Sequence, residues 1–182
     1  MRRVFALFLA LMVFSGCLSS SESDTKSETD SLQTTLDVFP SFNLSDEQNR
    51  THDDTLYEAI PYVAYFSASW CTHCKPTLDA LDQTIPKGHL LIFNKDPREE
   101  YSNMTEWKEY MESELNRSLA HPFFHAPSLA QSLNLSVIPS MFFVNQDGFI
   151  SHQQEGLKNR TIIQNQWDLI YSEYSNNSAN TD

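Results

Sequence analysis

The stretch Trp70-Cys71-Thr72-His73-Cys74 places two cysteines three positions apart, after an apolar run at 62–66 and before a helix-compatible segment at 75–81. Two cysteines at this spacing can close a small disulfide ring. The first of them then lies where the N–H groups and the dipole of the following helix stabilise a thiolate. A thiolate is the species that attacks disulfides. The stretch therefore predicts a thiol–disulfide exchange site with Cys71 and Cys74 as its reactive pair.

A pair of cysteines at this spacing is also half of a tetrahedral zinc site, which needs two further Cys or His ligands. The chain has three cysteines, and the third, Cys17, precedes the pair, so no second pair follows downstream. We therefore favour the redox interpretation, and we expect neither a metal ion nor a cofactor.

The chain begins with Met1-Arg2-Arg3, an apolar run at 4–14 and then Ser15-Gly16-Cys17. This run is shorter than the roughly 20 residues of a membrane-spanning helix and fits the apolar core of a signal peptide. Small residues before a cysteine resemble the lipobox of lipoproteins, although Phe14 stands where that pattern usually has Leu. We expect a signal peptide over residues 1–16 and a lipid on Cys17. The alternative is an ordinary secretory signal that leaves Cys17 as a free thiol.

The polar composition after this segment predicts how the rest of the chain is organised. Residues 19–31 contain no apolar side chain, so we expect a disordered, lipid-anchored tether over 17–35. Residues 36–175 have the length of one domain, and 176–182 are expected to be a disordered tail. The net charge of −12 argues against nucleic acid as a partner. We expect a monomer on the outer face of the cell membrane.

Hydrophobic patterning predicts strands that alternate with helices, as in an α/β fold. Continuous apolar runs predict buried strands at 62–66 and 89–94. The turn Gln146-Asp147-Gly148 predicts a hairpin between strands at 140–145 and 149–153. Helical spacing predicts four helices, at 71–85, 102–115, 128–134 and 157–174. We expect Ile163, Trp167, Ile170, Tyr171 and Tyr174 on the inner face of the last helix, and the pairing of the segment before residue 56 stays open.

This order of elements resembles the thioredoxin fold, and Val137-Ile138-Pro139-Ser140 stands where that fold has a cis-proline before its third core strand. From Cys71 to Pro139 is 68 residues, which leaves room for an inserted helix at 102–115. Such an insertion is similar to that of the membrane-anchored TlpA/ResA-like branch. The resemblance, over about 56–174, implies a central mixed sheet flanked by helices and a cis bond before Pro139.

The resemblance also implies roles for individual residues. Cys71 would be the attacking nucleophile and Cys74 the resolving thiol. Trp70 would shield the site, and the backbone at Ile138 and Pro139 would bind an extended substrate peptide. The implied partners are protein thiols or disulfides and a membrane redox protein.

Two departures from the family pattern affect the proton of the second thiol. Tyr65 stands where thioredoxin has a buried acid, and Thr77 stands where TlpA/ResA-like proteins often have Glu. Their absence weakens the expectation that the protein reduces its partners efficiently. His73 precedes Cys74 as in oxidising members of the fold. A donor beside Cys71 would stabilise its thiolate, so we expect a potential more oxidising than that of thioredoxin.

Two alternatives to an exchange enzyme remain. Cys71 and Cys74 could bind copper together with His121 or His125, in the manner of Sco-like chaperones. Those proteins have three residues between their cysteines and this chain has two, so we expect ordinary surface histidines. The other alternative is a redox-inert interaction domain that keeps the fold, against which the intact cysteine pair argues.

The chain is rich in Asn-x-Ser/Thr sequons, the acceptor sites for N-linked glycans. Its 12 Asn and 34 Ser or Thr in 182 residues predict about two by chance. It has seven, which start at Asn43, Asn49, Asn103, Asn116, Asn134, Asn159 and Asn176. We expect a glycosylated extracellular protein; a locally Ser-rich composition is the alternative explanation.

Overall fold

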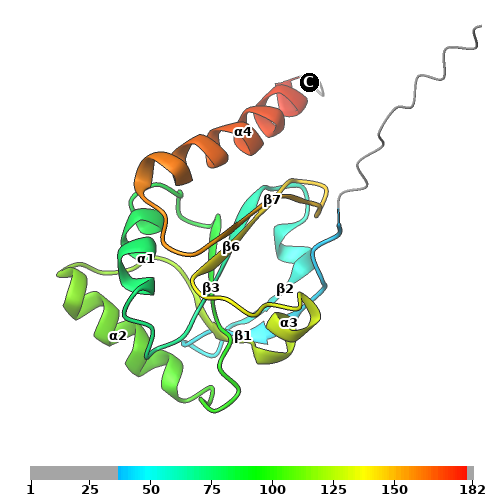
Figure 1. Cartoon of the computed structure of the whole chain (residues 1–182). Coiled ribbons are helices and arrows are strands. Elements are labelled where there is room, and N and C mark those ends of the chain that lie inside the picture. The colour runs from blue at the N-terminus through cyan, green and yellow to red at the C-terminus, as the bar shows by residue number, and fades with distance from the viewer. Residues whose placement is uncertain (1–36, 180–182) are drawn as a thin grey trace, which may run out of the picture. The chain divides into compact units, whose positions relative to one another are not determined.

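A five-stranded mixed sheet in the order β5-β4-β3-β6-β7 forms the centre of residues 37–179, the part of the chain that the computed structural model describes (Figure 1). Its middle strand β3 pairs in parallel with β4 and antiparallel with β6, while β5 and β7 form the edges. Every residue of β3, β4 and β6 is buried, which explains their almost continuous apolar sequences. The strands are β3 (Tyr62–Ser67), β4 (Leu90–Asn94), β5 (Phe123–His125), β6 (Ser140–Val144) and β7 (Ile150–Glu155).

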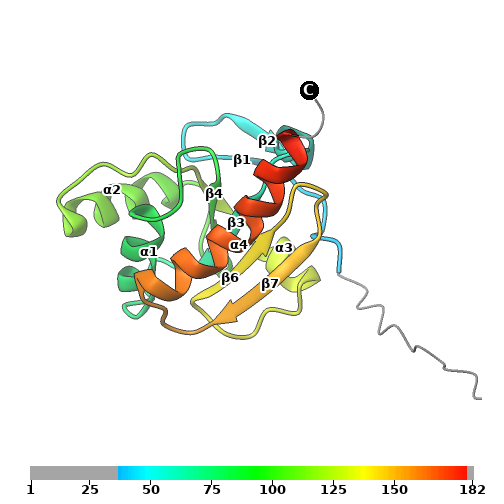
Figure 2. The same ribbon diagram turned by 90° about the horizontal axis from the view of Figure 1, so that it is seen from above.

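Helices cover both faces of this sheet. They are α1 (Cys74–Asp82), α2 (Asn103–Leu115), α3 (Pro127–Ser132) and α4 (Arg160–Ala179). Side chains of β3 alternate between two core clusters, as the two-residue period of a strand requires: Val63 and Tyr65 join one, and Tyr62 and Phe66 the other. The first cluster contains residues of α1, α2 and α4, and the second contains residues of α3. Figure 2 shows α4 and α3 on opposite sides of β6 and β7.

The segment before β3, whose pairing the sequence left open, packs on the α3 side of the sheet. It forms a two-stranded antiparallel hairpin, β1 (Asn43–Ser45) and β2 (Thr51–Asp53), followed by the 3-10 helix η1 (Asp54–Tyr57). Phe39 and Phe42 enter the second core cluster from this segment. Single bridges connect it to the main sheet, between Val38 and Phe149 and between Asp46 and Phe124.

The structure confirms the predicted α/β order, the thioredoxin-type sheet and the inserted helix α2, and it corrects several boundaries. The predicted helix at 71–85 is α1 at Cys74–Asp82, because the residues before Cys74 form a turn in which the Cys74 N–H binds the Cys71 carbonyl. The edge strand β5 was not predicted, since three residues are too few to show a period. Tyr171 was expected to face inward but is 41% exposed, because it lies about 100° around the helix from the buried Ile170.

The helix α4 ends at Ala179, so it includes the first four residues of the segment 176–182 that was expected to be a tail. The predicted signal peptide 1–16, the tether 17–35 and Cys17 lie outside the described residues. Within residues 37–179, no helix is both long and apolar enough to span a membrane.

Candidate active site

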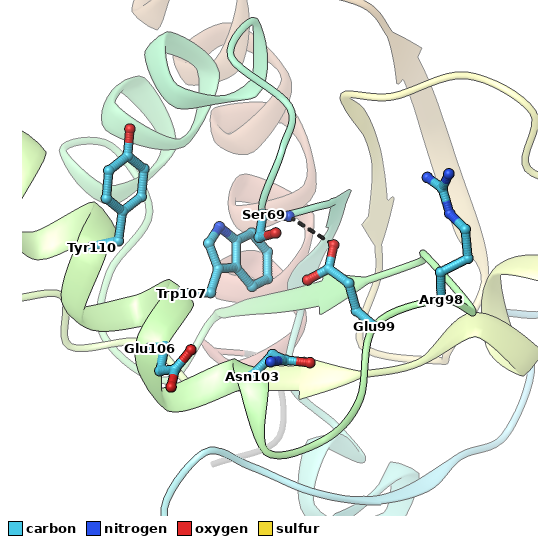
Figure 3. A pocket seen from close by; sticks show the side chains of 7 residues that line it. All are labelled: Ser69, Arg98, Glu99, Asn103, Glu106, Trp107 and Tyr110. Atoms are coloured by element: carbon cyan, nitrogen blue, oxygen red, sulfur yellow. Dashed lines mark hydrogen bonds between the residues drawn. The ribbon is translucent and has the colours of Figure 1, made fainter.

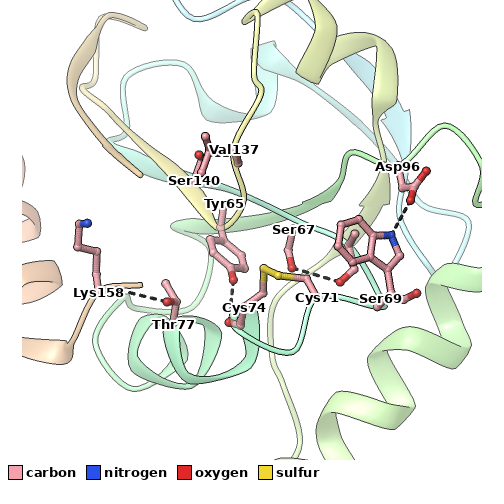
Figure 4. Close-up of a disulfide and its surroundings, with 12 residues drawn as sticks. Tyr65, Ser67, Ser69, Cys71, Cys74, Thr77, Asp96, Val137, Ser140 and Lys158 are labelled. Carbon is pink, nitrogen blue, oxygen red and sulfur yellow. Dashed lines mark hydrogen bonds between the residues drawn. A yellow bond between two sulfur atoms is a disulfide. The ribbon is translucent and has the colours of Figure 1, made fainter. Parts of the chain in front are cut away.

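The disulfide Cys71–Cys74 lies where the loop after β3 enters α1 (Figure 4). The Cα atoms of the two cysteines are 5.3 Å apart. Cys74 is 3% exposed and belongs to the core cluster on the α1 side, whereas Cys71 is half-buried at its margin. Cys71 is therefore the more accessible sulfur, and it lies just before the first turn of the helix, where free N–H groups favour an anion.

Trp70, next to the disulfide, is 56% exposed, but one edge of its indole ring is fixed by a hydrogen bond. Its indole Nε1–H donates a hydrogen bond of 2.5 Å to the Asp96 carboxylate (Figure 4). Hydrogen bonds from Arg98 hold the pKa of Asp96 well below its usual range; burial opposes this shift and Trp70 adds to it. The Arg98 guanidinium also lies 5.9 Å from the centre of the indole ring. An ionised carboxylate thus fixes Trp70 beside Cys71.

Sequence reasoning missed Asp96, although a signal for it was present. Asp96 lies two residues beyond the end of β4, which runs parallel to β3. Because parallel neighbours end at the same edge of a sheet, a polar residue there lies close to the loop that follows β3.

Beneath the disulfide, the two positions that carry acids in related proteins carry neutral hydroxyls. The Tyr65 hydroxyl donates a hydrogen bond of 2.8 Å to the carbonyl oxygen of Cys74 (Figure 4). Complete burial raises the pKa of Tyr65 far above its usual range, so the phenol stays neutral. The Thr77 hydroxyl is also buried, and it accepts the backbone N–H of Lys158 at 3.3 Å. Neither residue can take a proton from the Cys74 thiol near neutral pH.

The peptide bond between Ile138 and Pro139 is cis, as the resemblance implied. Pro139 is buried, and its carbonyl accepts the N–H of Gly156 at 2.7 Å. The side chain of Ile138 packs against the same core cluster as Cys71 and Cys74. Within residues 37–179, the N–H and the carbonyl of Ile138 form no hydrogen bond. The segment before Pro139 therefore presents backbone groups that a second chain can bind.

The three histidines that the sequence singled out, His73, His121 and His125, lie in different environments. His73 is exposed, and its side chain forms no hydrogen bond with any described residue. His121 was expected at the surface but is buried; its Nε2 is 3.3 Å from Asp82, at the opposite end of α1 from Cys74 and about 12 Å away along the helix. His125 Nε2 lies 3.2 Å from the Asp96 carbonyl oxygen. In the described part of the chain, no three His, Cys, Asp or Glu side chains are grouped to hold a metal ion.

Comparison with solved structures agrees with this geometry, whereas two comparisons of the sequence found no match. No protein-family model matches the sequence, and a search of curated proteins gave no match. Among solved structures, a thioredoxin-family thiol:disulfide interchange protein from Chlorobium tepidum superposes with a TM-score of 0.62 and 16% identity, over 75% of this chain and 97% of that one. A thio-disulfide isomerase from Thermus thermophilus gives a TM-score of 0.57 and 20% identity, over 74% and 95%.

A third match is the pneumococcal exposed lipoprotein thioredoxin from Streptococcus pneumoniae, with a TM-score of 0.57 and 18% identity, over 71% of this chain and 99% of that one. The chain thus covers nearly the full length of these structural neighbours, which are described as a thiol:disulfide interchange protein, a thio-disulfide isomerase and a thioredoxin. The chain therefore has the thioredoxin fold, with a C-x-x-C disulfide at the start of α1 and a cis-proline before β6.

Proposed function

We propose that this protein is an extracytoplasmic thiol–disulfide oxidoreductase that exchanges disulfides with protein substrates. The observation that carries the proposal is the disulfide of an accessible Cys71 and a buried Cys74 at the start of α1, in a thioredoxin fold with a cis Ile138–Pro139 bond. Structural neighbours described as thiol:disulfide interchange proteins support it.

The exchange proceeds through two attacks. In the reduced protein, the Cys71 thiolate attacks one sulfur of a substrate disulfide, forms a mixed disulfide and expels the other substrate sulfur as a thiolate. Cys74 then loses its proton and attacks the Cys71 sulfur, which releases the second substrate thiolate. Two electrons pass to the substrate and the Cys71–Cys74 disulfide forms. The same steps in reverse oxidise a substrate dithiol.

The neutral groups beneath Cys74 bear on the rate of exchange. Because Tyr65 and Thr77 accept no proton, Cys74 must give its proton to water or to the departing substrate thiolate. Oxidation of a substrate dithiol passes through the same step in reverse, so the missing base slows exchange in both directions and does not set the reduction potential. The expected potential, more oxidising than that of thioredoxin, rests on the exposed His73, which would stabilise the Cys71 thiolate and hence the reduced state.

A substrate would lie against the segment before Pro139. The free N–H and carbonyl of Ile138 can pair with an extended peptide, as in strand addition to a sheet. The exposed side chains of Trp70 and Val137 provide apolar contacts at the same site.

The proposed location depends on the N-terminal sequence. A signal peptide at 1–16 would export the chain, and a lipid on Cys17 with a tether at 17–35 would hold the monomeric domain near a membrane redox partner. The pneumococcal neighbour is described as an exposed lipoprotein. Mass spectrometry of the protein from its native host should detect a mature chain that begins at a lipid-modified Cys17. An unmodified protein free in the medium would contradict the anchor.

Exposure of the sequon asparagines supports glycosylation. Six of the seven are exposed; the exception, Asn103, is half-buried and accepts the Glu100 N–H through Oδ1. Asn49, Asn116 and Asn134 also lie at turns with left-handed backbone, at φ 61°, 51° and 51°. Glycopeptide mass spectrometry of native protein should find hexose-bearing Asn at exposed sequons, and unmodified Asn at all of them would contradict this part.

Insulin reduction tests the catalytic proposal. Cys74→Ser should trap a mixed disulfide with its substrate because the resolving thiol is gone, and Cys71→Ser should be inactive. Activity retained in Cys71→Ser would show that Cys71 is not the nucleophile.

A further inference from the structure

The loop at 68–73 joins β3 to α1 and contains Cys71, and we call it the redox loop. A cavity of about 360 Å³ lies between this loop and the inserted helix α2 (Figure 3). Ser69, Arg98 and Glu99 line it from the loops after β3 and β4, and Glu106, Trp107 and Tyr110 line it from α2. Ser69 is two residues before Cys71, so their Cα atoms are within about 7 Å of one another. Whatever occupies this cavity therefore lies beside a substrate bound at Cys71.

The cavity has an excess of negative charge. The Glu99 carboxylate accepts the Ser69 N–H at 3.3 Å (Figure 3). It also accepts a hydrogen bond of 2.9 Å from Asn94 Nδ2. Glu106 is exposed, and neither Glu99 nor Glu106 forms an ion pair with any cation of residues 37–179.

Arg98 does not neutralise these two carboxylates. Its guanidinium is already bound to Asp96, through Nε at 2.9 Å and through a second nitrogen at 2.5 Å. Glu99 and Glu106, on two different elements of the fold, therefore lie beside the redox loop without a direct ion-pair partner among the described residues.

Aromatic rings from α2 complete the cavity. Trp107 is buried against Phe123, and Tyr110 of the same helix is exposed. Figure 3 shows the side chains of Trp107 and Tyr110 at the cavity. Aromatic rings attract cations through their faces and pack against the methylene stems of Lys and Arg. Carboxylates at one part of a cavity and rings at another match a long side chain that is apolar along its stem and cationic at its tip.

We propose that this cavity is a specificity pocket for a lysine or arginine side chain of the protein substrate, next to the cysteine that is exchanged. The inference rests on the proposed oxidoreductase function, since it names the substrates that the Cys71 site prefers. The net charge of −12 also attracts basic substrates at long range, whereas the pocket recognises one side chain at one position.

Three disulfide-bonded peptides test the proposal on the full-length protein. They are identical except for the residue beside the reactive cysteine, which is Lys, norleucine or Glu. Rates of peptide reduction by the reduced protein give kcat/KM for each. We expect the Lys peptide to react about two- to fivefold faster than the norleucine peptide at low salt, the range of an exposed ion pair. The Glu peptide should be the slowest, and the differences should shrink at high salt.

Variants on α2 distinguish recognition of Lys by the pocket from attraction of Lys by the overall charge. Glu106→Gln should lower the Lys-to-norleucine ratio, because one of the two carboxylates of the pocket is lost. The matched control is Glu109→Gln, which removes the same charge from an exposed position of the same helix outside the cavity lining. It should leave the ratio unchanged. An equal decrease of this ratio in both variants would contradict the proposed pocket. Equal rates for the Lys and norleucine peptides with the wild-type protein would contradict it as well.

Failure of the pocket and failure of the proposed function give different results. Equal, measurable rates with all three peptides would contradict the pocket alone. Rates no higher than those of Cys71→Ser for every peptide would contradict the oxidoreductase function itself.

Discussion

The hydroxyl of Tyr65 donates a hydrogen bond of 2.8 Å to the carbonyl oxygen of Cys74, and both residues are buried. The middle strand of the sheet is thereby attached to the first turn of the helix that carries the disulfide. The same contact places a neutral phenol where thioredoxin has a proton-accepting acid. Tyr65 thus stabilises the site, but it cannot act as a base there.

Tyr65→Phe should lower the free energy of unfolding of the oxidised protein by about 1 kcal/mol, because a buried hydrogen bond to the Cys74 carbonyl is lost. Urea denaturation measures the change. Tyr62→Phe is the matched control on the same strand, since the Tyr62 hydroxyl forms no hydrogen bond with the described residues. A loss of the same size in both variants would mean that the Tyr65 hydrogen bond contributes no specific stability.

The sequence predicted the redox pair and the fold because both depend on local patterns. The cysteine spacing, the continuous apolar strands and the Val-Ile-Pro-Ser segment are each visible within ten residues of chain. The hydrogen bond of Tyr65 could not be predicted in this way. It depends on how closely β3 and α1 pack, and a Tyr within an apolar strand looks like any other core residue.

Contacts between distant segments were also invisible in the sequence. Glu47, in the turn between β1 and β2, binds Lys108 Nζ of α2 at 2.5 Å and the N–H of Phe123 at 2.9 Å. These residues are 61 and 76 positions from Glu47. The pairing of the N-terminal segment stayed open for this reason: polar residues of a short hairpin give no period that indicates their partners.

Glu47→Gln should lower the free energy of unfolding by about 3 kcal/mol, because it leaves the Lys108 charge buried without its counter-ion. The side chains of Glu47 and Lys108 are only 3% and 12% exposed. The comparison is Glu114→Gln, which breaks the exposed pair of Glu114 with Lys75 and should cost at most about 0.5 kcal/mol. Similar losses for the two variants in chemical denaturation would contradict the assignment of Glu47 as a buried anchor.

His121 should make the fold sensitive to acid. Burial lowers the pKa of His121, Asp82 opposes this effect, and Lys108 and Lys87 add to it. In the unfolded chain the value is about 6.5. The unfolded chain therefore binds the proton more readily, so this contribution to stability is complete above about pH 6.5 and decreases as the pH falls.

Free energies of unfolding measured between pH 5 and 8 would test this dependence. The slope between about pH 5 and 6.5 should be smaller in His121→Gln than in wild type. It should persist in His73→Gln, which removes an exposed histidine. An unchanged slope in His121→Gln would assign the acid sensitivity to other groups.

His73→Pro should lower the reduction potential of the Cys71–Cys74 pair, because it removes a donor that favours the Cys71 thiolate and hence the reduced state. A tenfold change in the dithiol–disulfide equilibrium corresponds to about 30 mV, which sets the expected scale. His152→Gln, on β7 outside the redox loop, is the control. An unchanged potential in His73→Pro would assign the oxidising tendency to the helix terminus alone.

The most direct test of the central claim is an equilibrium titration of the Cys71–Cys74 pair against glutathione redox buffers, with the thiols counted by alkylation and mass spectrometry. A redox enzyme of this fold should show one two-electron transition, with a midpoint between about −270 mV, as in thioredoxin, and about −120 mV, as in DsbA. Alkylation in the reduced state should occur first at Cys71, the more accessible sulfur. A disulfide that stays oxidised to below about −300 mV would be a structural bond and would contradict the proposed function.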